Sequence, residues 1–380
     1  MKTENGLTSR VRNVLKPVAR YSGQTNSISE ALYRSAVERF LHSYDAKCWA
    51  IKSASRGRIP DRDIGNIAKK FDPQTPAAKP IPFYEMPRVN KASRLVCDFP
   101  LRHRASQLMG QKLIAASFCP HDSIYSWRGR GKDQLVSDLE YQLRSKEATH
   151  IVVADIKDCF PNINIDAVRQ LQVFPSAFFD AAIDGRKMKF WEKGLFKNRS
   201  DYIHSQMDMA PPCNIVMGSE RAGLSGLLLG SATSNALLAM LFDDLHSQMP
   251  DGVILFVYSD NIVVVCRSED QCSQVQNNLV AYYSHHPAGP LTLEISFAGE
   301  ATLGFQLLGY QFDWENSQWV IRHSRKNWAG AFQRMLETYS EAEHDGVSLM
   351  ETLNVLIAGF PCLSAAAVGD LTEIVSEMSR

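Results

Sequence analysis

Residues 253–266 have the sequence VILFVYSDNIVVVC, in which two apolar, β-rich runs flank a polar turn centred on Asp260. Two such runs joined by a Ser/Asp/Asn turn predict a β-hairpin with an acid at its tip. Residues 149–155 have the sequence THIVVAD, a short apolar run that ends in Asp155. A buried strand can deliver a carboxylate to a site at its end in this way. The two stretches therefore predict a sheet in which two acids, distant in sequence, meet.

The composition is that of a globular protein: of 380 residues, 45% are hydrophobic and 22% are charged. The sequence contains no apolar run of about 18 residues, so we expect no membrane span. Its N-terminus lacks the apolar segment of a secretory signal, so we expect a cytoplasmic protein. The eight cysteines form no Cys-x-x-Cys pair, which argues against a zinc site and indicates reduced, mostly buried thiols.

The formal net charge is zero, but the charges are unevenly distributed along the chain. Residues 1–133 contain 24 Lys and Arg against 11 Asp and Glu, which gives +13. The remainder holds 17 basic and 30 acidic residues, which gives −13. A basic first third can attract phosphates, and an acidic remainder can carry metal-binding carboxylates. Chance segregation of charges on solvated surfaces is the alternative explanation.

Hydrophobic periodicity and turn residues predict the other elements. We expect a helix across residues 28–44, loops and short turns over 53–82, a strand pair within 83–104 and a helix over 101–118. Asp166 could cap a short helix, residues 231–249 predict the clearest helix, and residues 305–312 predict a strand interrupted by Gly309. About the last 60 residues again predict helices.

Two converging acids suit phosphoryl transfer. Two Mg²⁺ ions about 3.5–4 Å apart activate an attacking 3′-hydroxyl and neutralise the leaving pyrophosphate. Mg²⁺ prefers a few carboxylates together with phosphate oxygens and waters, which two acids on neighbouring antiparallel strands can supply. Taken alone, each acid also fits a structural explanation, because aspartates are common in turns.

Six segments resemble motifs of reverse transcriptases, and they occur in the order of that family. Residues 154–163 (ADIKDCFPNI) resemble the first palm motif, especially of the bacterial and group II intron enzymes, and residues 256–261 (FVYSDN) resemble the Tyr-x-Asp-Asp hairpin. Residues 226–235 (GLLLGSATSN) are similar to the loop-helix motif, and residues 307–310 (LLGY) to the primer-grip strand. Residues 88–100 resemble a fingers motif, and residues 125–131 (YSWRGRG) resemble a segment that typically has the sequence Tyr-Gly-Phe-Arg-x-Gly-Arg.

The resemblance implies roles for the matching residues. Asp155 and Asp260 would ligate two Mg²⁺ ions, or Mn²⁺ in their place, with help from the Ile156 backbone carbonyl, and Asn261 would complete the catalytic set. Phe160 would fill the space of a ribose 2′-hydroxyl and favour dNTPs, unless it is a core aromatic. The other residues implied to bind the dNTP are Arg88, Lys91, Arg94, Gly230 and Ser231. Those implied to contact nucleic acid are Trp127, Arg128, Arg130, Tyr258, Leu308 and Gly309.

Three features depart from the family pattern. Asn261 stands where most members have a second Asp, which removes one negative charge but keeps an oxygen ligand. Leu229 replaces the usual Gln of the loop-helix motif, and the lysine often found before the primer grip is absent from residues 291–297. In these departures the chain resembles divergent bacterial reverse transcriptases linked to phage defence and abortive infection.

The fold implied by the resemblance is α+β, a right-hand polymerase of fingers, palm and thumb with an antiparallel palm sheet packed on helices. Residues 1–82 would form an N-terminal helical extension and linker, 83–148 the fingers, 149–322 the palm with fingers insertions, and 323–380 a small helical thumb.

The implied function is that of a nucleotidyltransferase, an RNA-directed DNA polymerase in bacterial antiviral defence. It would copy an RNA template, a repeat template, or add dNTPs with little template. Its expected partners are a non-coding RNA, the DNA product, and a partner protein or a second copy of the chain, with no membrane.

Two alternatives stay open. A degenerate palm could hold a structured RNA or a partner polymerase without catalysis, an interpretation that Asn261 and Leu229 motivate. An RNA-dependent RNA polymerase shares the palm. Phe160 argues against this second alternative, because RNA polymerases need room for the 2′-hydroxyl.

Overall fold

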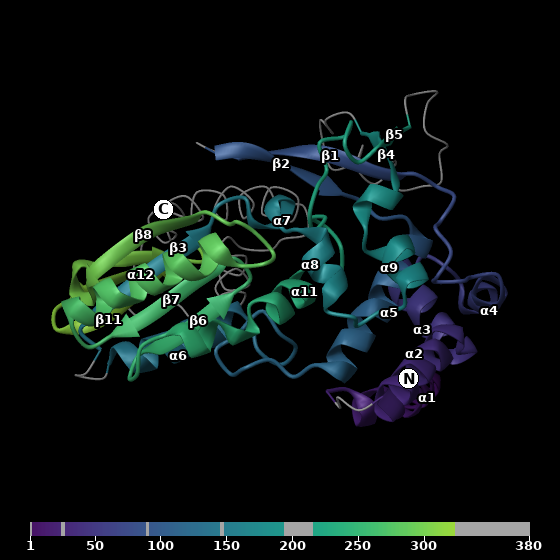
Figure 1. The fold of residues 1–380 in the computed structure, drawn as a ribbon, viewed down its shortest axis with the longest axis horizontal. Helices are drawn as coiled ribbons and strands as arrows, with labels where there is room; N and C mark the ends of the chain where they lie inside the picture. Colours follow the sequence, from purple (N-terminus) through teal and green to yellow (C-terminus); the bar gives the residue numbers. More distant parts are fainter. Residues whose placement is uncertain (1, 24–26, 89–90, 145–147, 194–215, 324–380) are drawn as a thin grey trace, which may run out of the picture. The chain divides into compact units, whose positions relative to one another are not determined.

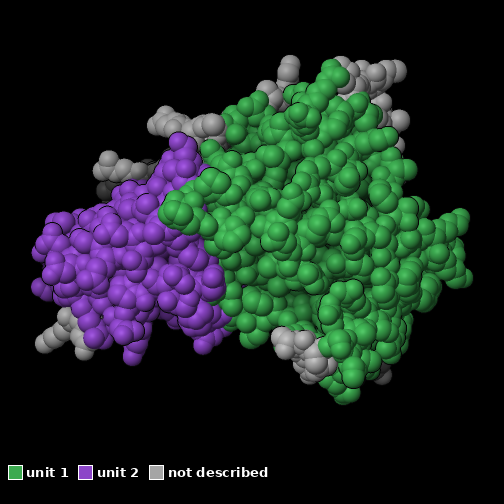
Figure 2. Space-filling view, viewed as in Figure 1, with its two compact units in different colours: residues 1–120, 158–243, 284–291 green, residues 121–157, 244–283, 292–380 purple. Residues whose placement is uncertain are grey.

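The computed structural model describes residues 2–23, 27–88, 91–144, 148–193 and 216–323 (Figure 1). The thumb predicted for residues 323–380 lies, apart from residue 323, outside the described residues. The chain divides into two compact units. Unit 1 consists of residues 1–120, 158–243 and 284–291, and unit 2 of residues 121–157, 244–283 and 292–380 (Figure 2). The finer division into fingers, palm and thumb stays a prediction.

Unit 1 begins with a set of packed helices. They are α1 (Lys2–Tyr21), α2 (Ser27–His42), α3 (Tyr44–Ser55), α4 (Asp61–Lys69) and α5 (Leu101–Ser117). Helix α1 packs against α2, α3 and α5, and α3 packs against α4 and α5. The helices predicted over 28–44 and 101–118 are thus confirmed as α2 and α5. Within the described ranges, no helix has both the length and the apolar character needed to span a bilayer.

The loops and short turns predicted for residues 53–82 are wrong over α4. Ile64 and Ala68 are buried four residues apart, on one face of the helix. Asp61 and Asp63 stand in the first turn and Lys69 in the last, where their charges complement the helix dipole. The surrounding prolines and lysines obscure this short pattern in the sequence.

The sheet of unit 1 has the strand order β2-β1-β4-β5. Strands β1 (Ile81–Arg88) and β2 (Lys91–Cys97) form the antiparallel pair that the sequence predicts within 83–104. Strand β1 also pairs in parallel with β4 (Lys189–Glu192), which pairs in antiparallel with β5 (Met217–Gly218). Buried Lys193, just after β4, lies 3.0 Å from a carboxylate oxygen of Asp98, just after β2. This ion pair joins the ends of the two strands.

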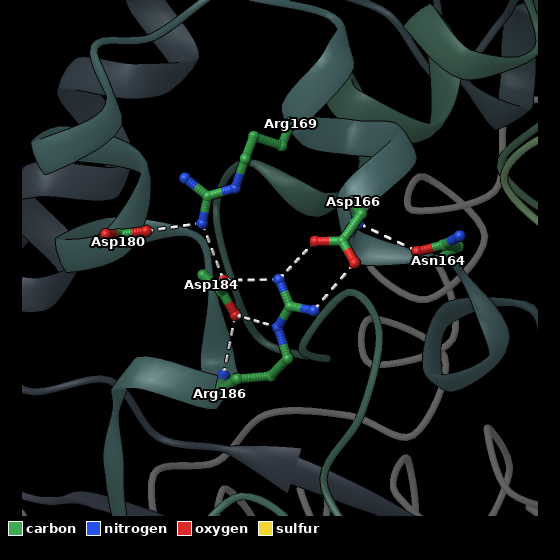
Figure 3. A network of polar contacts seen from close by, with 6 residues as sticks. All are labelled: Asn164, Asp166, Arg169, Asp180, Asp184 and Arg186. Atoms are coloured by element: carbon green, nitrogen blue, oxygen red, sulfur yellow. Dashed lines mark hydrogen bonds and ion pairs between the residues drawn. The ribbon is translucent and has the colours of Figure 1, made fainter.

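A buried carboxylate holds the short helices of unit 1 together (Figure 3). These helices include α8 (Ile165–Gln170), α9 (Ser176–Ala182) and the 3₁₀ helix η1 (Gly185–Lys187). The side chain of Asp184 is 0% exposed. It accepts hydrogen bonds from the backbone N–H, Nε and Nη2 of Arg186 at 3.0, 2.9 and 2.9 Å, and from Arg169 at 3.0 Å. Arg169 also pairs with Asp180, and Arg186 with Asp166.

Two predicted helix features are wrong in detail. Asp166 does not cap the helix it begins, because Asn164 is the N-cap and accepts from the Asp166 N–H at 3.0 Å. The single helix predicted over 231–249 is divided into α11 (Ser234–Leu241) and the 3₁₀ helix η2 (Asp243–Gln248). The Leu241 carbonyl oxygen, at the end of α11, bonds to Nε2 of His286 at 3.0 Å.

Unit 2 is built on a four-stranded antiparallel sheet of order β6-β7-β3-β8 (Figure 1). Its strands are β3 (His150–Ile156), β6 (Ile254–Tyr258), β7 (Asn261–Cys266) and β8 (Leu293–Glu300), with α12 (Glu269–His285) between β7 and β8 in sequence. This strand order is that of a split β-α-β arrangement. The predicted α+β class, the strand at 149–155 and the hairpin at 253–266 are confirmed.

One face of this sheet packs on α6 (Lys132–Leu143) and on a second sheet, β11-β10-β9. The second sheet consists of β9 (Phe305–Leu307), β10 (Tyr310–Glu315) and β11 (Gln318–His323). The strand predicted over 305–312 with an interruption at Gly309 is confirmed as β-structure, but it consists of two antiparallel strands instead of one. Leu308 and Gly309, with φ of 49° and 85°, form a two-residue turn between β9 and β10. Two successive positive φ angles are typical of the type I′ hairpin turn.

Candidate active site

Strand β3 delivers Asp155 to one end of the four-stranded sheet. Its directly opposed neighbours are Asn261 on β7 and Glu294 on β8. Opposed residues of antiparallel strands point to the same face, with Cβ atoms about 4.5–5.5 Å apart. The three polar side chains therefore lie on the face where Ile151 and Val153, at alternate positions of β3, pack into the core. The apolar strands end where this polar patch begins.

The tip of the β6–β7 hairpin brings Asp260 to the same end of the sheet. The loop has two residues, Ser259 and Asp260. The φ of Ser259 is 60°, whereas the φ of Asp260 is not positive. A positive φ at the first loop position alone is typical of a type II′ turn. The backbone N–H of Ile156 donates to the Asp260 carbonyl oxygen at 3.0 Å. This bond attaches the hairpin tip to the residue that follows Asp155.

Asn261 acts on the carboxylate beside it. Its side-chain amide donates to Oδ1 of Asp260 at 3.0 Å. All three residues of the set Asp155, Asp260 and Asn261 are half-buried. The geometry thus brings together the three residues that the sequence predicts as catalytic, with two carboxylates instead of three.

This donor set fits a hard divalent cation. Carboxylate and carbonyl oxygens are the ligands that Mg²⁺ prefers, and it commonly takes only one or two carboxylates alongside substrate phosphates. In the described part of the chain, no group of three or more His, Cys, Asp or Glu is arranged to hold a metal ion. Asp155 and Asp260 would hold such an ion together with a triphosphate. The ligand role predicted for the Ile156 carbonyl stays a prediction.

Glu294 and Lys157 are polar residues at this site that the sequence does not single out. Lys157 continues β3 beyond Asp155, because its N–H donates to the Thr292 carbonyl oxygen at 2.9 Å. Its Nζ lies 3.6 Å from Oε1 of Glu294. The signal that could have found Glu294 is its position in the apolar stretch that forms the fourth strand, but the sequence does not give the register.

Phe160 lies in unit 1, in the short helix α7 (Cys159–Asn162), and is 8% exposed. Its carbonyl oxygen accepts from the Leu227 N–H at 2.8 Å. Gly226 approaches this carbonyl so closely that a Cβ there would lie 2.2 Å from the oxygen, and its φ is +61°. Two motifs of the sequence, residues 154–163 and 226–235, therefore meet in the backbone. The steric-gate role of the Phe160 ring stays a prediction.

The second glycine of the loop meets strand β2. A Cβ at Gly230 would lie 2.2 Å from the Cys97 carbonyl oxygen, and the φ of Gly230 is +94°. The Cys97 N–H in turn donates to the Leu229 carbonyl oxygen at 2.9 Å. Oγ of Ser231 accepts from the Thr233 N–H at 3.3 Å, in the turn that begins α11. The loop is thus attached at both glycines, and the dNTP contacts of Gly230 and Ser231 stay predictions.

The three basic residues predicted to hold the triphosphate belong to the β1–β2 hairpin. Arg88 and Lys91 are paired in register, and Arg94 lies opposite Met86. Arg94 is half-buried, while the side chains of Arg88 and Lys91 lie outside the described residues. Their phosphate-binding role stays a prediction.

The glycine-rich loop before α6 is held by Arg130. Nη1 of Arg130 donates to the carbonyl oxygens of His121 and Ile124 at 2.9 and 3.0 Å, and Nη2 to Oδ1 of Asp122 at 2.5 Å. Arg130 therefore organises its own loop, a structural role that the sequence does not predict. Trp127 is half-buried and Arg128 is exposed. The nucleic-acid contacts of these three residues stay predictions.

The same loop runs beside the outer strand β6. The Val257 N–H donates to the Ser123 carbonyl oxygen at 2.8 Å, and the Tyr125 N–H donates to the Val257 carbonyl oxygen at 2.7 Å. The Tyr125 hydroxyl donates to Asp138 at 2.6 Å. Burial, together with this hydrogen bond to a carboxylate, raises the pKa of Tyr125 well above its usual range.

The other residues predicted to contact nucleic acid are Tyr258, Leu308 and Gly309, on the side of the sheet that carries Asp155. Tyr258 closes the β6–β7 hairpin opposite Asn261, and it is half-buried against the core cluster of unit 2. Leu308 packs against the same cluster from the β9–β10 turn. Gly309 follows it in the turn. A nucleic-acid role for these residues stays a prediction.

No family model matches the chain, and no curated protein matches it in sequence. Solved polymerases are similar in part. The Sicinivirus 3Dpol RNA-dependent RNA polymerase has a TM-score of 0.45 and 10% identity, over 80% of this chain and 63% of that one. Apo telomerase from Candida tropicalis, truncated from its C-terminal domain, has a TM-score of 0.36 and 11% identity, over 66% and 56%.

The BmCPV RNA-dependent RNA polymerase at the elongation state has a TM-score of 0.38 and 11% identity, over 88% of this chain and 31% of that one. The chain thus spans less than two thirds of the length of each of these solved chains. Likenesses at such identities and TM-scores do not define a family for it.

Proposed function

We propose that this chain is a nucleic-acid polymerase of the reverse-transcriptase type, which adds dNTPs to a 3′ end. One observation carries the proposal: Asp155 and Asp260, distant in sequence, lie at the same end of one sheet. The Ile156 N–H, beside Asp155, bonds to the Asp260 carbonyl oxygen at 3.0 Å, and Asn261 lies opposite Asp155. Nucleotidyl transfer needs carboxylates that converge in this way.

The proposed mechanism assigns each residue one task. Asp155 and Asp260 would hold two Mg²⁺ ions, which, when bound, supply the positive charge that phosphoryl transfer needs. Asn261 would orient the Asp260 carboxylate through its amide hydrogen bond. Phe160 would exclude a ribose 2′-hydroxyl, and the attachment of Gly226 to its carbonyl supports a fixed backbone there.

Incorporation of radiolabelled dNTPs by the purified chain, with Mg²⁺ or Mn²⁺ and an RNA template with a primer, tests the proposal. Asp260→Ala should lower incorporation by about 10³-fold or more, because losing about 4 kcal/mol of charge stabilisation has that effect. Asp251→Ala, at an exposed turn of the same unit, is the matched control and should leave incorporation unchanged. Asn261→Asp should be tolerated. Unchanged incorporation by Asp260→Ala would refute the assignment.

A second candidate function is that of a scaffold that binds RNA or a partner without catalysis. Asn261 is the observation that favours it, because it removes one carboxylate from the site. This candidate predicts that the wild-type chain retains RNA in a filter-binding assay but incorporates neither dNTPs nor NTPs with either metal.

The nucleotide preference separates DNA from RNA synthesis. If Phe160 is the steric gate, the wild type should prefer dGTP to GTP, and Phe160→Val should reduce that preference while Asp260-dependent incorporation persists. A wild type that prefers GTP would identify an RNA polymerase.

We further propose that the template is a non-coding RNA and that the chain serves bacterial antiviral defence. Asn261 and Leu229, which depart from the family pattern, support this step by analogy only. Sequencing of nucleic acid that copurifies with the chain tests the template. Plating of phage on cells that express wild type or Asp260→Ala tests the defence role, which requires protection by the wild type alone.

A further inference from the structure

Helix α1 has an uneven distribution of charge. From residue 7 to its end at Tyr21 it contains four basic residues and no acidic one. Three of the four, Arg12, Lys16 and Arg20, follow one another at intervals of four residues, and all three are exposed. Residues at this spacing lie on the same face of a helix. We call these three residues the basic face of α1.

The other side of α1 is buried. Val11 and Val18, which are 3% and 0% exposed, lie two turns apart on that side, and α1 packs against α2, α3 and α5 (Figure 1). A basic amphipathic helix can lie on an anionic membrane only if its apolar side is free to enter the lipid. In α1 that side is already used within unit 1. A phosphate ligand in water therefore fits the basic face, and a bilayer does not.

The basic face weakens the helix that carries it. Like charges four residues apart repel each other and destabilise a helix, and the basic face contains two such pairs in succession. Arg20 stands in the last turn, where a cation complements the helix dipole. Arg12 and Lys16 lie in the helix interior, where the dipole offers no such compensation. Among the described residues, no carboxylate forms an ion pair with either of them.

Other cations of these helices do have carboxylate partners. Arg34 on α2 pairs with Glu30, four residues before it, and Arg10 on α1 pairs with Asp45 on α3 at 3.0 Å. The first two cations of the basic face are thus an exception, since no described carboxylate on their own helix or on a neighbouring one offsets them. Like charges that cost helix stability in this way indicate an anion that is supplied from outside the chain.

We infer that the basic face of α1 binds the phosphate backbone of single-stranded nucleic acid. The inference deepens the proposed function, because the choice of nucleic acid as the anion rests on it. The three cations stand at steps of about 6 Å along the helix, and they offer charge to successive phosphates without reading bases. The net charge of +13 over residues 1–133 adds a wider attraction. The alternative is a solvated face that binds nothing.

Fluorescence anisotropy of a labelled oligouridylate, titrated with the purified full chain at several salt concentrations, tests the inference without turnover. For single strands, each phosphate contact contributes about 0.7 to the slope of log affinity against log salt. The triple variant Arg12→Gln, Lys16→Gln, Arg20→Gln should therefore lower the magnitude of the slope by about 2, and it should weaken binding by about tenfold or more at about 50 mM salt.

Single changes on the same helix supply the matched control. Lys16→Gln should lower the slope by about 0.7, whereas Arg10→Gln, which removes a cation already paired with Asp45, should leave it unchanged. Lys16→Glu separates binding from folding. It places an acid four residues from two arginines, which favours the helix, so the midpoint of urea unfolding should not fall, while RNA binding weakens more than in Lys16→Gln.

Three outcomes overturn the inference: a wild type that binds no oligouridylate, an unchanged slope in the triple variant, and equal effects of Arg10→Gln and Lys16→Gln. Sedimentation of the wild type with phosphatidylglycerol vesicles, together with an unchanged slope in the triple variant, would identify a membrane surface instead. The proposed function fails separately, because it requires that Asp260→Ala lose dNTP incorporation while it retains RNA binding. If the wild type incorporates no dNTP but the triple variant lowers the slope, only the polymerase assignment is wrong.

Discussion

Replacing buried Asp184 by asparagine should destabilise unit 1 by about 2–3 kcal/mol. Breaking a buried ion pair by removing one partner typically costs about 3–5 kcal/mol. Here the partners Arg186 and Arg169 have side chains that are 49% and 34% exposed, so water can solvate them after the change, and we expect a loss somewhat below that range. Asparagine also replaces one acceptor oxygen by a donor, and it therefore cannot accept all four hydrogen bonds that Asp184 accepts.

Urea unfolding of the full chain, followed by circular dichroism, measures this loss. The matched control is Asp180→Asn, which removes a carboxylate that pairs with the same Arg169 but is 39% exposed. It should cost about 1 kcal/mol or less, as exposed pairs do. Equal unfolding midpoints for Asp184→Asn and Asp180→Asn, at equal slopes, would refute the reasoning from burial.

The pH dependence gives a second measurement on the same variant. Burial by itself raises the pKa of Asp184, but hydrogen bonds from the Arg186 side chain and backbone, and from Arg169, outweigh it and lower the pKa below its usual value. A carboxyl group with a lowered folded-state pKa stabilises the fold above its unfolded pKa of about 3.9 and loses this contribution as pH falls through the folded value. The wild type should therefore exceed Asp184→Asn in free energy of unfolding by its full amount at neutral pH, and this difference should shrink only below about pH 4.

Three further changes test other parts of the structure. Gly226→Ala puts a Cβ 2.2 Å from a backbone carbonyl at a positive φ and should cost about 2–4 kcal/mol in urea unfolding; a neutral effect would contradict the close approach. Trp319→Phe removes an indole N–H that donates to a buried backbone carbonyl at 3.0 Å and should cost about 1–2 kcal/mol in the same assay. Burial raises the pKa of Cys97 and Cys266 to about 12, so iodoacetamide at mildly alkaline pH should alkylate exposed Cys119 first, as followed by peptide mass mapping; earlier labelling of either buried thiol would argue against its burial.

The sequence predicts the elements that local pattern determines. The apolar runs around Asp155 and Asp260 suffice to predict two strands and a hairpin, because burial on both sides of a strand gives continuous apolar residues. Convergence of the two acids follows from that pattern together with the motif order. The type I′ turn at Leu308 and Gly309 escapes prediction, because leucine rarely adopts the positive φ that the turn requires.

Features that depend on register or tertiary contact cannot be read from local pattern. Glu294 faces Asp155 only because Ser296 is an extra residue in its strand, and nothing in the local sequence marks a bulge there. Asp184 is one of several aspartates in a polar stretch, and its burial arises from the packing of helices around it. Gly226 is visible in the sequence, but the Phe160 carbonyl oxygen that leaves no room for a Cβ there belongs to a distant segment.

The pairing of Ser123 and Tyr125 with Val257 has a consequence for the behaviour of the protein in concentrated solution. An outer strand with unsatisfied backbone groups invites strand addition from another molecule, the first step toward fibrils and precipitates. Because Ser123 and Tyr125 already bond to Val257, the fourth of the five residues of β6, addition of a strand from another molecule at this part of the sheet edge is disfavoured. A deletion of residues 123–125, or a proline introduced there, should therefore lower the soluble yield on expression.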